Sequence, residues 1–346
     1  MMRAPEFWYQ SPPTLAARML APLAAIYAAG TARRLAQGAR EKVGVPVICV
    51  GNLNAGGTGK TPTVIDIAGR LQARGMAVHI VSRGYGGSAT ETLRVDERSH
   101  DAALTGDEPL LMSAFAPVWV SRDRMAGARA AVADGAQVIL LDDGFQDPAL
   151  AHDLSLVVVD AARGFGNGLC LPAGPLREPV AAGLARADLL VSIGPPAAQA
   201  GFAPPPEAGD LAHLRATLQP LTTGMDWPGH RVLAFAGIGH PDKFFATLRD
   251  LGADLVATQA LDDHQPLTPA LLARLDAQAR QAGAQLVTTE KDAVRLPAQM
   301  RGRVLAVPVR LQVADPAPLT DALDRLFREH GAGGLCNRAG DPDIGA

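Results

Sequence analysis

The sequence has few of the features of disulfide-bonded, zinc-bound or membrane-spanning proteins. Its 346 residues include only three cysteines, which are far apart and odd in number: Cys49, Cys170 and Cys336. Such spacing indicates neither a disulfide framework nor a zinc site. No uninterrupted apolar run approaches the roughly 18 to 20 residues that a spanning helix needs. We therefore expect a protein of a reducing cytoplasm that does not cross a membrane.

A large charge of one sign is also lacking. The formal net charge is -3 at pH 7, so the chain has no basic field of the kind that a nucleic-acid backbone demands, and we expect no nucleic-acid partner. Apolar residues make up 48% of the chain and charged residues 19%, which favours a compact globular protein over a disordered one. Single cores rarely exceed roughly 250 residues, so this length predicts about two domains.

Short β-branched runs alternate with helical stretches from Val45 onward. Alternation of this kind predicts an α/β fold, with a mostly parallel sheet and helices on both faces. The predicted strands are residues 45–50, 77–82, 117–121, 138–141, 154–160 and 189–193, and the first helix is residues 61–74. Residues 194–209 are rich in proline, alanine and glycine, which predicts a loop and a domain boundary.

A second alternating block predicts a smaller α/β domain. Its strands are residues 231–236, 255–259 and 285–289, and its helices are residues 241–251 and 268–282. Residues 304–313 and 214–221 are expected to pair as a two-stranded connection between the domains. A last helix is predicted at 319–330, and residues 331–346 are expected to be disordered. The predicted division is an N-terminal helical segment (1–44), a larger α/β domain (45–210), a smaller α/β domain with the linker (211–312), the last helix (313–330) and the tail (331–346).

The N-terminal segment combines an aromatic cluster, an apolar helix at residues 14–29 and a basic flank. Such a combination suits a membrane interface. The apolar side chains also form one helical stripe, which equally suits packing on the protein's own core, so both interpretations are open at this point. Glu6 and Arg18 disfavour a signal peptide. The cluster is Phe7, Trp8 and Tyr9, the stripe is Leu15, Met19, Leu23, Ile26 and Tyr27, and the flank is Arg33, Arg34, Arg40 and Lys42.

The strand at 45–50 leads into a glycine-rich loop directly before a helix, as a phosphate-binding loop requires. Glycines let backbone N–H groups point at phosphate, and the helix N-terminus adds the positive end of its dipole. Lys60 is expected to reach the β and γ oxygens of ATP, and the hydroxyl of Thr61 to bind Mg²⁺. The first glycine of the usual pattern is replaced by Asn54. The predicted nucleotide-binding residues are Asn54, Ala55, Gly56, Gly57, Thr58, Gly59, Lys60 and Thr61.

An apolar strand that ends in Asp142 and Asp143 is the expected partner that holds Mg²⁺, directly or through water. A solvated strand end or a helix cap is the alternative for these two aspartates. Ala55 stands where the partner-activated, dimerising P-loop ATPases carry a second lysine. The segment Thr288-Thr289-Glu290-Lys291-Asp292 does not match the guanine-reading motif of GTPases. The loop therefore favours an ATP-dependent kinase.

A kinase that acts on an alcohol needs a group to receive or orient the hydroxyl proton. Asp107, next to Glu108 at a predicted helix start, is one candidate, although an N-cap role suits the same position. His264 follows a predicted strand of the second domain and has Asp263 beside it. Because lone histidines are usually structural, sequence chemistry alone does not select it.

Taken together, these motifs resemble one family, the tetraacyldisaccharide 4'-kinases of lipid A biosynthesis. The resemblance extends over most of the chain, and many ordered matches make it specific. The matching segments are residues 51–52, 56–62, 82–86, 106–109, 142–146, 174–179, 234–239, 263–264 and 288–292.

The resemblance implies transfer of the ATP γ-phosphate to the 4'-hydroxyl of a tetraacylated glucosamine disaccharide 1-phosphate, forming lipid IVA. It also implies peripheral attachment to the cytoplasmic face of the inner membrane, which makes the N-terminal helix a lipid-facing element. The implied partners are the acylated disaccharide and the membrane surface, and no obligate protein partner is indicated. A P-loop switch ATPase and a soluble small-molecule kinase remain as alternatives.

Carried over residue by residue, the resemblance implies catalytic roles for five side chains. Asp107 would take the hydroxyl proton with His264 as its partner, Lys60 would bind phosphate, and Arg124 or Arg177 would balance phosphate charge. Asp142 or Asp143 and Glu178 would hold or orient Mg²⁺, and Tyr85 and Gln146 would contact substrate or nucleotide. Asp147 departs from the family, in which a histidine is common. We expect domain closure on ATP to bring His264 to Asp107.

Overall fold

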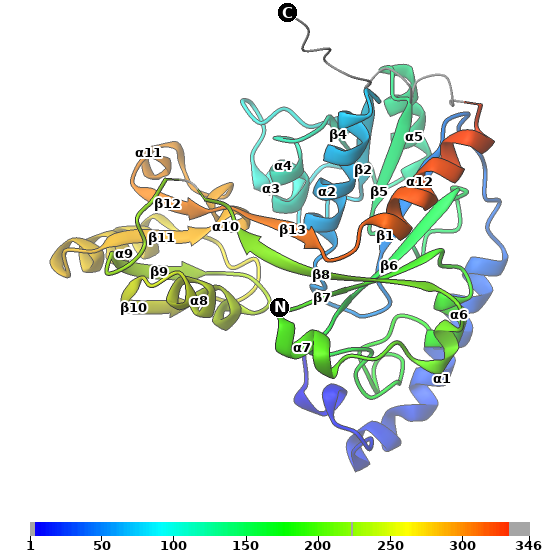
Figure 1. Cartoon of the computed structure of the whole chain (residues 1–346), viewed down its shortest axis with the longest axis horizontal. Coiled ribbons are helices and arrows are strands. Elements are labelled where there is room, and N and C mark those ends of the chain that lie inside the picture. The colour runs from blue at the N-terminus through cyan, green and yellow to red at the C-terminus, as the bar shows by residue number, and fades with distance from the viewer. Residues whose placement is uncertain (1–3, 223, 332–346) are drawn as a thin grey trace, which may run out of the picture.

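The computed structural model describes residues 4–222 and 224–331, which form two sheets (Figure 1). The larger sheet has nine strands in the order β13-β8-β7-β6-β1-β5-β2-β4-β3, and the smaller has four in the order β10-β9-β11-β12. We call residues 225–307, which carry the smaller sheet, the small lobe, and the rest the large lobe. The mixed, mostly parallel α/β architecture predicted from the sequence is confirmed.

The seven central strands of the large sheet, from β8 to β4, are parallel, and antiparallel pairs add β13 and β3 at its edges. All pairs in the small sheet are parallel. The large-sheet strands are β1 (Val47–Gly51), β2 (Val78–Ser82), β3 (Leu93–Arg94), β4 (Val118–Val120), β5 (Val138–Asp142), β6 (Leu154–Asp160), β7 (Leu189–Ile193), β8 (Ala212–Pro220) and β13 (Val309–Val313). The small-sheet strands are β9 (Arg231–Ala236), β10 (Asp254–Ala260), β11 (Gln285–Thr289) and β12 (Val304–Val307).

Helices cover both faces of the large sheet, because its central strands are buried along their whole length and need apolar cover on each side. One face packs α2 and α12, and the other packs α5 and part of α1. The large-lobe helices are η1 (Glu6–Tyr9), α1 (Leu15–Ala36), α2 (Lys60–Ala73), α3 (Ala102–Thr105), α4 (Asp107–Met112), α5 (Arg124–Ala133), α6 (Val180–Leu184), α7 (Pro196–Gly201), η2 (Pro206–Ala208) and α12 (Ala317–Glu329). The small-lobe helices are α8 (Pro241–Asp250), α9 (Pro269–Gln281), α10 (Glu290–Ala293) and α11 (Ala298–Arg301).

The connection between the lobes differs in part from the prediction. The pairing of the two linker segments is confirmed, since β13 and β8 are antiparallel neighbours with Leu311 opposite Leu218. The single strand predicted at 304–313 is wrong, because it divides at Pro308 into β12 in the small sheet and β13 in the large one. Proline has no N–H to donate to a ladder, which suits a crossing between sheets.

Two other predicted segments need comment. The loop predicted at 194–209 contains the short helices α7 and η2, each of which begins with proline at its first or second position. The tail predicted at 331–346 lies outside the described residues, apart from Gly331.

Helix α1 is longer than predicted and lies on the outer side of the large lobe, away from the small lobe (Figure 1). Its buried residues Ala17, Ala24 and Thr31 recur every seven positions, Leu35 lies about one helical turn further on, and together they form one narrow contact face. The predicted apolar stripe is exposed instead, with Leu15 at 74% and Ile26 at 70%, so the interpretation that it packs on the core is wrong. By length and composition alone this helix is also able to cross a membrane, contrary to the expectation from uninterrupted runs.

Candidate active site

The glycine-rich loop joins the buried central strand β1 to helix α2, as predicted. Gly59 ends the loop with φ of 97°, and a Cβ there would lie 2.6 Å from Cδ1 of Ile193. Only glycine meets both requirements without strain. The Asn52 amide braces the loop from inside, donating to the carbonyl of Gly56 (3.2 Å) and the hydroxyl of Thr58 (3.1 Å). Lys60 and Thr61 follow as the first residues of α2, whose N-terminus favours an anion.

The start of the loop is tied to the segment at 161–176. The Asn54 side chain donates to the carbonyl of Gly164 at 3.1 Å, and the N–H of Ala55 donates to the carbonyl of Pro175 at 2.7 Å. Gly56 and Gly57, in contrast, are exposed. The two predicted residues at the loop start therefore brace it, and the exposed glycines are the part open to a ligand.

The Asp143 carboxylate contacts two cationic side chains, Lys60 and Arg177. Lys60 Nζ lies 3.6 Å from Oδ1 of Asp143, and Arg177 Nη1 donates to the same oxygen at 2.9 Å. Burial alone would raise the pKa of Asp143, but these two charges outweigh it and hold the pKa below its usual value. The residue has φ of 55°, a left-handed conformation that is uncommon outside glycine and recurs at functional sites. The arrangement places two cationic side chains beside the loop.

Asp142 ends β5 with its carboxylate fully buried. Ser82 Oγ donates to Oδ2 at 3.0 Å, while Oδ1 has no hydrogen-bond partner among the described residues. Burial, followed by the charges of Glu108 and Asp143, raises the pKa of Asp142 to about 7. The Oδ1 oxygen is therefore available as a ligand for a cation.

The other predicted metal residue, Glu178, is fully engaged. Arg186 donates to both of its oxygens, at 2.8 Å and 3.0 Å, and Gln146 donates to Oε1 at 3.0 Å. Across residues 4–222 and 224–331, no three His, Cys, Asp or Glu side chains converge as a metal cage. Mg²⁺ is commonly held by one or two carboxylates together with substrate phosphates and water. Asp142 and the hydroxyl of Thr61 fit that role better than Glu178 does.

Arg124 is turned toward the loop after β5. It donates to Asp147 Oδ2 at 2.7 Å and to the carbonyl of Asp143 at 2.6 Å. Asp147, where the family commonly has histidine, thus holds the arginine that was expected to balance phosphate charge.

Asp107 and His264 meet across the two lobes. His264 Nδ1 lies 2.9 Å from Asp107 Oδ2, and the Asp107 side chain is only 3% exposed. Gly106 occupies the N-cap of α4, so the capping alternative for Asp107 is wrong. His264 has φ of 59°, and its backbone N–H donates to the carbonyl of Gly237, directly after β9. The contact joins α4 of the large lobe to the loop after β10 of the small lobe.

The contact changes the titration of both partners. Burial alone would raise the pKa of Asp107, but contact with His264 and the charges of Lys291 and Arg295 hold it below its usual value. Contact with Asp107 in turn raises the pKa of His264, against the opposing effects of burial and Lys291. Asp107 is therefore ionised near neutral pH and available to accept a proton.

Known proteins resemble this chain over most of its length. Residues 16–328 match the model of the family described as Tetraacyldisaccharide-1-P 4'-kinase. The Tetraacyldisaccharide 4'-kinases of Dinoroseobacter shibae and Rhodospirillum centenum are 65% and 52% identical to this chain; both alignments span 94% of it, and 98% and 96% of the respective relatives. The chain belongs to the tetraacyldisaccharide-1-P 4'-kinase family.

A solved structure of a family member has the same fold as this chain. The crystal structure of the "apo" form of LpxK from Aquifex aeolicus in complex with ATP superposes with a TM-score of 0.73 at 27% identity, over 90% of this chain and 100% of that one. The kinase transfers the ATP γ-phosphate to the 4'-hydroxyl of a tetraacylated disaccharide 1-phosphate in lipid A biosynthesis. The function predicted from the sequence is confirmed, and the switch-ATPase and small-molecule-kinase alternatives are set aside.

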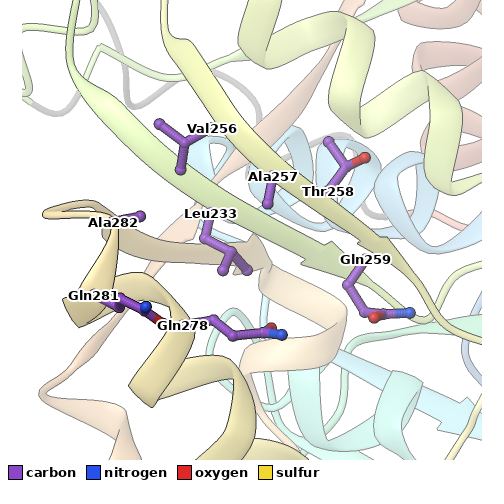
Figure 2. A pocket seen from close by; sticks show the side chains of 8 residues that line it. All are labelled: Leu233, Val256, Ala257, Thr258, Gln259, Gln278, Gln281 and Ala282. Carbon is purple, nitrogen blue, oxygen red and sulfur yellow. The ribbon is translucent and has the colours of Figure 1, made fainter.

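A surface pocket of about 410 Å³ lies away from this site, at the edge of the small sheet beside α9 (Figure 2). Its lining residues carry no ionisable side chain, so it offers nothing for phosphoryl transfer. They are Leu233, Val256, Ala257, Thr258, Gln259, Gln278, Gln281 and Ala282.

Sequence reasoning missed a group of side chains around the Asp107–His264 pair. Lys291 of the small lobe donates to Glu108 Oε1 at 2.9 Å, and Arg295 Nε lies 4.0 Å from Asp107 Oδ2. Lys291 is in the segment 288–292, which matches the family but by itself indicates no role beside Asp107. Its proximity to Glu108 is set by the packing of the lobes, for which the sequence holds no local signal.

Proposed function

We propose that the Asp107–His264 pair accepts the proton of the 4'-hydroxyl while the P-loop of the kinase holds the ATP phosphates. The observation that carries the proposal is the 2.9 Å contact between the two side chains, one from each lobe. On this view the lobes act as two domains, the large one binding ATP and the small one completing the site.

Transfer of the hydroxyl proton to Asp107 follows from the ionised state of its carboxylate. The hydroxyl oxygen attacks the γ-phosphorus, the bond from that phosphorus to the bridging oxygen breaks, and ADP leaves with the electron pair. The hydroxyl proton passes to the Asp107 carboxylate, which His264 orients through Nδ1. Because the transition state is loose, the main task of such a residue is to orient the nucleophile and to take its proton late. The ionised state of Asp107 suits both tasks.

The phosphate side of the site is built on Lys60, Arg177 and the exposed glycines of the loop. Lys60 and Arg177 share Asp143 as their counter-ion. A phosphate that binds beside the loop can therefore pair with two positive charges that are already in position. Thr61 and Asp142 are the residues that would hold Mg²⁺, which when bound would neutralise charge on the β and γ oxygens.

Helix α1 supports peripheral binding to the cytoplasmic face of the inner membrane, where the acylated substrate resides. Its exposed stripe faces away from the protein while its opposite side packs on the large lobe. A helix held along its length by its own protein suits the interface plane better than a lone span. Arg33 and Arg34 in its last turn add charges that attract anionic lipid.

The roles are tested by phosphate transfer from γ-labelled ATP to the detergent-solubilised tetraacylated disaccharide 1-phosphate. Wild type, Asp107→Asn, His264→Ala and Lys60→Ala are compared, with omission of the acceptor as the background. We expect Asp107→Asn to lower kcat by about 100-fold or more with little change in the KM for ATP, because the variant keeps shape and loses basicity. Lys60→Ala should raise the KM for ATP as well.

The control is Asp147→Asn, whose carboxylate also contacts a site arginine but lies apart from the proton path. Asp107→Asn with near wild-type kcat would exclude the proton-accepting role. If His264→Ala lowered only the melting temperature and left kcat unchanged, the pair would be a structural link between the lobes.

A further inference from the structure

Lys291 lies where two acidic side chains and His264 converge. Its Nζ is 2.9 Å from Glu108 Oε1, 3.5 Å from His264 Nε2 and 3.9 Å from Asp263 Oδ1. Glu108 belongs to α4 of the large lobe, next to Asp107, whereas Lys291 belongs to α10 of the small lobe. The lysine therefore touches the second ring nitrogen of the histidine whose first nitrogen faces Asp107.

The chemistry of an ammonium restricts what that second nitrogen can do. Lysine has three donors and no acceptor, so only an unprotonated Nε2 can form a hydrogen bond with it. A proton on Nε2 would instead face the ammonium and would have Asp263 Oδ1, 3.7 Å away, as its acidic neighbour. With Nε2 unprotonated, the single ring proton resides on Nδ1, the nitrogen that lies 2.9 Å from Asp107 Oδ2.

We propose that Lys291 is a positioning residue that keeps the proton of His264 on Nδ1, facing Asp107, and opposes a second proton on Nε2. The proposal rests on the proposed role of the Asp107–His264 pair. A neutral histidine leaves Asp107 more basic than an imidazolium would, because a full positive charge 2.9 Å away stabilises the ionised carboxylate. Lys291 thus favours the state that can accept the hydroxyl proton.

The groups facing His264 come from every element around it. Asp107 and Glu108 come from α4, Asp263 from its own loop, Lys291 from α10, and Arg295 from the turn after α10; the Tyr85 ring lies edge-on at 6.0 Å. Asp107 and Asp263 raise the pKa of His264, and Lys291 lowers it. Glu108 holds the ammonium in place, and its charge helps keep the pKa of Lys291 above its usual value despite burial.

The test uses the full-length kinase in detergent, with ¹⁵N-labelled histidine and the variants Lys291→Met and Lys291→Arg. The first readout is the ¹⁵N shift of the two His264 nitrogens across pH, assigned by loss of the signal in His264→Ala. In wild type we expect an unprotonated Nε2 and a protonated Nδ1 above the histidine pKa. In Lys291→Met we expect this pKa to rise by roughly half a unit to one unit, since a nearby positive charge is removed.

The second readout is kcat as a function of pH. Lys291→Met should lower kcat on the order of tenfold at pH 7, with a smaller deficit at pH 9, while the KM for ATP changes less than about twofold. Its acid limb should shift to higher pH together with the NMR pKa. Lys291→Arg keeps the charge and the donors, and should restore the position of the acid limb.

Lys243→Met is the matched control. Lys243 is another small-lobe lysine paired with a large-lobe carboxylate, Asp160, at 2.6 Å, and it does not touch His264. If Lys243→Met reproduced the shifted acid limb, the effect would belong to any ion pair between the lobes, and the proposal would be overturned. It would also be overturned by a His264 tautomer and pKa unchanged in Lys291→Met. A normal kcat in His264→Ala would reject the proposed function instead, whatever the NMR result.

Discussion

At the scale of single residues, the buried carboxylate of Asp142 lowers the stability of the folded protein at neutral and higher pH. Its folded pKa of about 7 exceeds the usual 3.8 because the carboxylate is buried beside Glu108 and Asp143. The folded state thus holds a proton that the unfolded state has lost, so stability falls as pH rises from about 4 to about 7. We expect Asp142→Asn to stabilise the ligand-free kinase on the order of 1–3 kcal/mol at pH 8, and less at pH 5.

Thermal unfolding at pH 5 and pH 8 measures this. The melting temperature of Asp142→Asn should exceed that of wild type by about 2–5 °C at pH 8, while phosphate transfer falls sharply. An equal gain at both pH values would show that the benefit comes from packing and not from the charge. Asp143→Asn is the control, because the pKa of Asp143 is lowered and its removal should destabilise at pH 8.

The residues that could be predicted were those with a local signal. Lys60 and Thr61 were identified by the loop around them, and the family resemblance singled out Asp107 and His264. Lys291 could not be found in this way, because its partner Glu108 is 183 positions away in the sequence. Glu178 shows the opposite limit, since no pattern indicated that Arg186 would occupy both of its oxygens.

At the scale of elements, the turn from the P-loop into α2 depends on Gly59. With φ of 97° and Ile193 in the way of a Cβ, Gly59→Ala should destabilise the kinase by about 1–3 kcal/mol and weaken ATP binding. Gly57→Ala is the control for stability, since Gly57 has no positive φ and its Cβ would meet nothing within 4 Å.

Chemical denaturation of both variants, with ATP affinity measured alongside, distinguishes backbone strain from a general effect of losing glycine. Equal stability losses in the two variants would contradict the geometric argument. Gly57→Ala is a control for stability only and not for activity, because the exposed N–H of Gly57 belongs to the part of the loop open to a ligand.

Most elements could be predicted from periodicity, including strands β6, β7, β9 and β11 with their observed limits. The run at 304–313 could not, because its β-branched pattern continues through Pro308 while the chain passes from one sheet to the other. The hydrophobic pattern of a strand indicates that it is buried, but it does not indicate which sheet the strand joins.

At the scale of the whole molecule, ion pairs connect the two lobes. Lys291 with Glu108 and Lys243 with Asp160 both connect the small lobe to the large one. Residues from both lobes thus contribute to the candidate site, so we expect substitutions in either lobe to affect a single reaction.

The proposed membrane binding places the stripe along α1 against the lipid. Leu15→Glu with Ile26→Glu places two charges on its most exposed part, where transfer into lipid is unfavourable. We expect this variant to lose most of its flotation with liposomes of inner-membrane composition. Its transfer activity on detergent-solubilised acceptor should stay near that of wild type, because the stripe faces away from the nucleotide site.

Ala25→Glu with Ala32→Glu is the matched control, with the same added charge at exposed positions on a different side of the helix. It should float nearly as well as wild type if one stripe meets the lipid. A helix that crosses the bilayer would be damaged by either pair, because charges on every side of a span enter hydrocarbon. Equal loss in both variants would therefore contradict the interfacial arrangement and favour a spanning one, whereas normal flotation of the stripe variant would remove α1 from the membrane contact altogether.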